Sequence, residues 1–143
     1  MKKIMGLLFL MWSSISFASF SGRWNGWGTW SYQGSETNCD SMTLTFIETK
    51  DKLIRKGGYF DCQILGLEID AKEWKKEGNN LIIDGLVVGT INDNSIHLTE
   101  QYSDTIKVDS DIVRTAGHFD YNETWYDKDD FQFYQIKGRF FKM

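Results

Sequence analysis

Apolar and polar residues alternate along most of the chain, and short groups of turn residues separate the alternating runs. The clearest run is Leu65 to Lys72, where apolar residues at odd positions alternate with glycine and charged residues. A period of two places the apolar side chains on one face of a β-strand. Gly, Asn and Asp separate the runs, which is typical of consecutive β-hairpins. The pattern therefore predicts an all-β chain without a long helix after the N-terminal segment.

Eight long strands follow from this pattern. They are Arg23–Tyr32, Met42–Ile47, Leu53–Phe60, Leu65–Ala71, Leu81–Ile91, Ile96–Tyr102, Phe119–Trp125 and Phe131–Phe141. The number rises to ten if the fifth strand divides at Gly85 and if residues 103–114 form a strand instead of an irregular loop. In the last strand the apolar face changes parity near Phe133 and Tyr134, so we expect a bulge there.

Sequential hairpins of this number favour an antiparallel up-and-down β-barrel, because closure of the sheet removes its exposed edges. A β-sandwich is the alternative architecture. The charged segment 70–77 is compatible with a helix, but the period of two that precedes it favours a strand.

The N-terminus has the features of a secretory signal peptide. Two lysines precede an apolar run from Ile4 to Trp12, and small residues, Ser16 and Ala18, stand at positions −3 and −1 of a cleavage site. A membrane-spanning helix needs about 20 apolar residues, and this run is shorter. We predict that residues 1–18 are removed, that residues 19–143 form one barrel domain without a transmembrane anchor, and that the protein is bacterial and periplasmic or secreted.

The two cysteines, Cys39 and Cys62, suggest a disulfide in an exported chain. If Lys50 and Asp51 form a two-residue turn, residues paired across that hairpin have numbers that sum to 101. The two cysteine numbers also sum to 101, so the side chains lie opposite each other in this register. Two free buried thiols are the alternative. Two distant cysteines and two scattered histidines predict no metal site.

Charge and motifs narrow the classes of partner and reaction. The formal net charge is −4, or about −6 without the two lysines of the signal peptide. An acidic chain without a Lys/Arg cluster disfavours nucleic acid as a partner. No nucleophile elbow, zinc-protease motif or phosphate loop occurs, so we expect no cofactor and name no catalytic residue. His97 and His118 fall on polar strand faces.

Two tripeptides carry a resemblance to a known family. Gly22-Arg23-Trp24 resembles the Gly-x-Trp motif at the first strand of lipocalins, and Gly138-Arg139-Phe140 lies where that group often places an arginine against the first-strand tryptophan. The chain thus resembles the lipocalin-like, or calycin, family of small β-barrels. The resemblance implies structural roles for Gly22, Trp24 and Arg139, with a cation–π contact between the last two.

Aromatic residues on predicted inner faces are the candidate ligand site. They are Trp24, Trp30, Tyr32, Tyr121 and Trp125. Such rings can stack a small apolar or aromatic ligand inside a barrel. The alternative is that they fill the barrel, which would then act through its surface as a protein-binding, inhibitory or envelope-associated module. We predict a non-enzymatic ligand-binding barrel as the leading function.

Glu123 is the most unusual candidate, because it stands between Tyr121 and Trp125 on the apolar face of its strand. A carboxylate that faces a barrel interior is costly unless it is paired. One interpretation is that it binds a polar ligand group. Others are an ion pair with Arg23, Arg55 or Arg139, a position near an open barrel mouth, and an enzymatic role as a general acid or base.

Overall fold

The computed structural model describes residues 19–143, and the predicted signal peptide, residues 1–18, lies outside the described residues. The strands are β1 (Gly22–Tyr32), β2 (Ser35–Glu48), β3 (Lys52–Cys62), β4 (Leu65–Ile69), β5 (Lys72–Glu77), β6 (Asn80–Ile83), β7 (Leu86–Ile91), β8 (Ser95–Gln101), β9 (Lys107–Thr115), β10 (His118–Tyr126) and β11 (Gln132–Lys142). Within this part of the chain no helix is long and apolar enough to cross a membrane.

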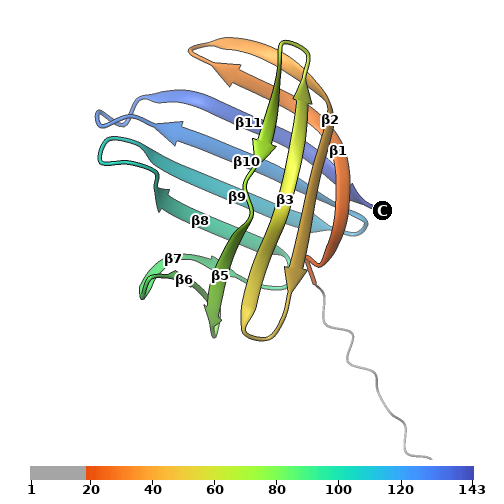
Figure 1. The fold of residues 1–143 in the computed structure, drawn as a ribbon, viewed down its shortest axis with the longest axis vertical. Coiled ribbons are helices and arrows are strands. Elements are labelled where there is room, and N and C mark those ends of the chain that lie inside the picture. Colours follow the sequence, from red (N-terminus) through yellow and green to blue (C-terminus); the bar gives the residue numbers. More distant parts are fainter. Residues whose placement is uncertain (1–18) are drawn as a thin grey trace, which may run out of the picture.

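The strands close into an antiparallel barrel, as predicted. β1 pairs with both β2 and β11, so the first and last strands complete the circuit. β3 pairs with β4 along its C-terminal half and with β5 along its N-terminal half. Ten strands therefore form the closed circuit, and β4 is an extra strand attached only to β3. Figure 1 shows β8 to β11 side by side in chain order, running across the direction of β2 and β3.

Several details of the strand prediction are confirmed. Residues 107–115 form β9, and 72–77 form β5 and not a helix. The predicted fifth strand divides at Asp84 and Gly85, which both have positive φ. A bulge separates Trp125 from Tyr126 in the pairing of β10 with β11 and leaves Phe133 as the extra residue. The predicted strand Leu65–Ala71 ends earlier, at Ile69 of β4, and the sequence pattern did not predict the break at residues 70 and 71 before β5.

This break produces an opening in the barrel wall. β4 has a strand partner on one side only, because β6 pairs with β5 and not with β4. On the other side of the opening, β7 pairs with Ile96–Leu98 of β8 but not with the last residues of that strand. Lys72 of β5 and Glu100 of β8 form an ion pair that joins the two sides.

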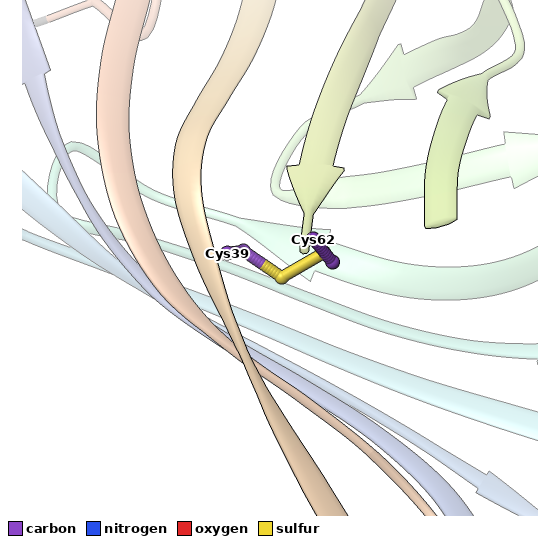
Figure 2. Close-up of a disulfide and its surroundings, with 2 residues drawn as sticks. All are labelled: Cys39 and Cys62. Carbon is purple, nitrogen blue, oxygen red and sulfur yellow. A yellow bond between two sulfur atoms is a disulfide. The ribbon is translucent and has the colours of Figure 1, made fainter. Parts of the chain in front are cut away.

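Cys39 and Cys62 form the predicted disulfide between β2 and β3 (Figure 2). The turn at Lys50 and Asp51 sets the predicted register for the residues next to the turn, where the numbers of paired residues sum to 101. Further along the hairpin one bulge adds Lys56 to β3, and a second bulge adds Asp40 to β2. The two bulges offset each other, so the cysteines still lie opposite each other.

One end of the barrel is filled by a hydrophobic core. Phe20, just before β1, is fully buried there, and its carbonyl oxygen accepts a hydrogen bond of 2.8 Å from the Trp24 indole. Phe46, Leu53 and Phe119 are buried around this pair. Burial of each such side chain contributes about 1.5–3 kcal/mol relative to exposure. This end of the barrel is therefore closed and supplies much of the stability of the fold.

The Arg139–Trp24 contact expected from the lipocalin resemblance is wrong. Arg139 lies opposite Trp27 in the β1–β11 register and points outward, where its guanidinium pairs with Asp120 at 2.8 Å. Phe140, the next residue, faces the core, and side chains alternate along a strand. The cation over the Trp24 ring is instead Lys142, at 5.9 Å from the ring centroid.

Candidate functional site

A cavity of about 480 Å³ occupies the other end of the barrel and reaches the opening between β4 and β8. The later part of β10 supplies Glu123 and Trp125 to its wall, and β11 supplies Tyr134. Ser110 of β9 lies on the same inner surface. These positions pair across neighbouring strands, with Glu123 opposite Ser110 and Trp125 opposite Tyr134. The regular alternation of the strands thus turns a carboxylate and two rings toward one space.

Glu123 is held by two neutral donors. Its Oε1 accepts a hydrogen bond of 2.7 Å from the Tyr121 hydroxyl, and its Oε2 accepts one of 2.9 Å from the Trp125 indole. No Lys or Arg nitrogen of residues 19–143 forms an ion pair with this carboxylate, so the interpretation that Arg23, Arg55 or Arg139 pairs with it is wrong. The half-buried negative charge remains without a cationic partner.

Aromatic rings form a continuous wall beside Glu123. Trp125 and Tyr134 pack with centroids 5.1 Å apart, and Trp30 meets Tyr134 edge to face at 5.8 Å. Trp30 in turn stacks with Tyr32 at the rim, where Tyr32 is 42% exposed. The Trp30 indole nitrogen is buried beside Tyr134. The wall presents flat aromatic surface to the cavity through Trp125 and Tyr134.

The tyrosine hydroxyls near Glu123 resist ionisation. Burial raises the pKa of Tyr134 to about 12; a hydrogen bond with the Trp30 indole opposes the shift, and the negative charge of Glu123 adds to it. Burial also raises the pKa of Tyr121 well above its ordinary value, with a further contribution from Glu123 that the positive charge of Arg55 opposes. Both phenols therefore stay neutral at physiological pH, and the Tyr121 hydroxyl donates to Glu123.

Two cations at the mouth of the cavity are engaged elsewhere. Lys72 pairs with Glu100 across the opening. The Nε of Arg55 donates a hydrogen bond of 2.9 Å to the backbone oxygen of Asp70, and its guanidinium lies 5.6 Å from the centroid of the Trp74 ring. The lining also contains the carboxylates of Glu68, Asp70, Glu100 and Glu123, so its formal charge is −2.

The structure brings together most of the ligand-site residues predicted from the sequence. Glu123 and Trp125 line the cavity, and Tyr121 supports Glu123 from the core side. Trp30 and Tyr32 reach the site through their contacts with Tyr134 and each other. The remaining candidate, Trp24, is buried at the filled end of the barrel and has no place in the cavity.

Sequence reasoning missed Tyr134, Ser110 and Glu100. Glu100 continues the alternation of Ile96 and Leu98, and this signal was sufficient to place it on the inner face. The bulge at Phe133 obscured the orientation of Tyr134.

A second hollow lies on the outer surface of the barrel. It is larger, at about 700 Å³, but it is shallow and runs over the glycines of β1 and β11 beside Trp27. Trp27 is 57% exposed and stacks on Phe141, with ring centroids 5.4 Å apart. Its lining contains the ion pair of Asp120 and Arg139 as well as Asp111 and Lys137. The interior cavity is better enclosed and holds a half-buried carboxylate beside aromatic rings, so it is the stronger candidate site.

Residues 19–143 contain no group of three or more His, Cys, Asp or Glu residues placed to hold a metal ion. The chain matches no protein-family model and no curated protein at a significant level.

Proposed function

We propose that the protein is an exported β-barrel that binds one small ring-containing ligand in its open end and does not act as an enzyme. The observation that carries the proposal is the division of the barrel interior into a filled end and a cavity of about 480 Å³. Binding sites for small molecules have volumes of about 300–1,000 Å³ and combine apolar walls with a few polar groups. The cavity lies within this range of volume, and its lining combines aliphatic and aromatic side chains with six charged residues. The opening between β4 and β8 gives the ligand its path.

The arrangement of Glu123 supports binding more than catalysis. Its hydrogen bonds come from an indole and a phenol whose pKa is raised, and neither group is an activated nucleophile. The hydrogen bonds of Tyr121 and Trp125 hold the Glu123 carboxylate in one orientation, which suits it to fix the orientation of a bound ligand.

Export is part of the proposal. The disulfide between Cys39 and Cys62 is the type of cross-link that persists in oxidising compartments. Together with the signal peptide predicted for residues 1–18, it supports a periplasmic or secreted location.

The outer surface favours a second candidate function. The exposed stack of Trp27 and Phe141 is a pair of aromatic side chains of the kind enriched at protein interfaces. A barrel that acts through this surface would bind a protein partner, and its interior cavity would be incidental.

Native mass spectrometry of the protein purified from the cells that make it tests the leading proposal. We expect an additional mass of a few hundred daltons or less, which is lost when the protein is denatured, because the cavity has room for one small molecule. The denatured mass serves as the internal control. A protein that stays at its bare mass after incubation with a library of small aromatic compounds contradicts ligand binding and favours the outer-surface function.

A further inference from the structure

The charge of the cavity indicates the chemistry of its ligand. Resting on the proposed function, we propose that the site selects a ligand with a cationic amine, which binds Glu123 while its ring packs on Trp125 and Tyr134. The juxtaposition that carries the inference is a carboxylate without a cationic partner beside aromatic rings in one cavity.

Glu123 has hydrogen-bonding capacity left for a ligand. A carboxylate has about four lone-pair positions, and the phenol of Tyr121 and the indole of Trp125 occupy one on each oxygen. A protonated amine supplies up to three donors and a full positive charge. The resulting charge-assisted hydrogen bond is stronger than a bond between neutral groups. A ligand of this kind completes a site that the protein itself leaves half satisfied.

The rings favour the same charge. The faces of Trp and Tyr carry negative potential and attract a cation within about 6 Å of the ring centroid. Trp125 and Tyr134 lie beside the carboxylate, and their centroids are 5.1 Å apart. One ligand can thus present its ammonium group to Glu123 and its hydrocarbon part to the ring surfaces.

Neighbouring charged residues do not remove the preference of the cavity for a cation. Lys72 already pairs with Glu100, and the guanidinium of Arg55 lies against Trp74 and donates to a backbone oxygen. The formal charge of −2 over the lining therefore acts on an approaching ligand and attracts cations into the opening. An anionic ligand would have to bind the terminal nitrogens of Arg55, whose Nε donates to the backbone oxygen of Asp70, and would face the negative charge of Glu123.

Isothermal titration calorimetry with three matched probes at pH 7 tests the selectivity. The probes are 2-phenylethylamine, which is cationic, 2-phenylethanol, which is neutral, and 3-phenylpropionate, which is anionic. We expect the amine to bind at least about tenfold more tightly than the alcohol, and the propionate to bind most weakly. Glu123→Gln keeps the shape of the side chain, so it lowers the affinity for the amine about 10- to 100-fold and changes that for the alcohol by less than about twofold.

Glu73→Gln is the matched control, because Glu73 is exposed on β5, pairs with Lys52 and lies outside the cavity lining. Its affinity for the amine stays within about twofold of the original protein. Equal binding of amine and alcohol overturns the selectivity but leaves ligand binding intact. Tightest binding of the propionate also overturns it and assigns the site to Arg55. If none of the three probes binds, the proposed function itself fails. The comparison of probes on the unaltered protein decides the question even if Glu123→Gln does not fold.

Discussion

Glu123 contributes to stability as well as to the site, because it is the acceptor for two partly or fully buried donors. The Tyr121 hydroxyl and the Trp125 indole both donate to its carboxylate. A buried donor that loses its acceptor costs about 1–3 kcal/mol. The Glu123 side chain thus serves both ligand binding and stability. Different substitutions at this position separate the two roles.

We predict that Glu123→Ala lowers the free energy of unfolding by about 1–3 kcal/mol, whereas Glu123→Gln costs less because its amide oxygen still accepts a hydrogen bond. Urea denaturation monitored by tryptophan fluorescence measures both values. If the alanine variant is as stable as the glutamine variant, the two donors find other acceptors and the hydrogen bonds to Glu123 do not stabilise the fold.

Tyr134 links stability to alkaline pH. Its pKa is raised from 10.0 to about 12, mainly by burial, so the folded protein keeps a proton that the unfolded chain releases first. Folding stability therefore decreases as the pH rises from about 10 toward 12. We predict that Tyr134→Phe shows a smaller loss of stability between pH 9 and 11 than the unaltered protein, measured as the shift of the urea midpoint. Equal shifts in the two proteins would mean that Tyr134 titrates normally in the folded state.

At the scale of elements, the hairpin of β2 and β3 shows how a simple register argument succeeds. The turn at Lys50 and Asp51 follows from the sequence, and so does the pairing of the cysteines. The bulges at Asp40 and Lys56 do not follow from it, because the alternation of apolar residues tolerates one extra residue in either strand. The prediction is correct because the two shifts cancel.

The disulfide of this hairpin restricts the unfolded chain. It closes a loop between residues separated by 23 positions, for which the chain-entropy relation gives a stabilisation of about 3 kcal/mol. We predict that replacing both cysteines by serine lowers the free energy of unfolding by about 2–4 kcal/mol and abolishes any effect of a reducing agent on the urea midpoint. The oxidised and reduced forms of the unaltered protein are the controls. A reducing agent that leaves the midpoint of the unaltered protein unchanged would contradict a stabilising role.

At the scale of the whole molecule, the sequence predicts local geometry better than position along the barrel axis. Alternation places Trp24, Glu123 and Trp125 correctly on inner faces, since the period of two is a local property. It does not show that Trp24 lies at the filled end and the other two at the open end. That difference depends on the stagger of strands far apart in sequence, such as β1 and β11. The orientation of Arg139 is missed for another reason, because the family resemblance overrode the alternation.

The opening in the wall was also beyond prediction. Leu65 to Lys72 alternates without interruption, yet β4 and β5 separate because only β5 finds a partner in β6. The pairing partner of a strand edge is a nonlocal property, and a single sequence does not contain it. Residues 107–115 were hard to interpret because Asp109, Ser110 and Asp111 make this stretch polar, while the cavity accepts Ser110 on its inner surface.

Because β4 is attached to β3 alone, the sequence of β4 can change with limited effect on the rest of the sheet. Rebuilding β4 changes five residue pairs with β3 but none in the ten-strand circuit, and Leu67 and Ile69 of β4 pack against the hydrophobic core. The strand that borders the path of the ligand is thus separate from the strands that hold the barrel closed. Substitutions in β4 that keep Leu67 and Ile69 apolar can change which molecules pass, while the pairing of the ten-strand circuit remains intact. The barrel therefore has one segment in which new specificities can arise without breaking the closed sheet.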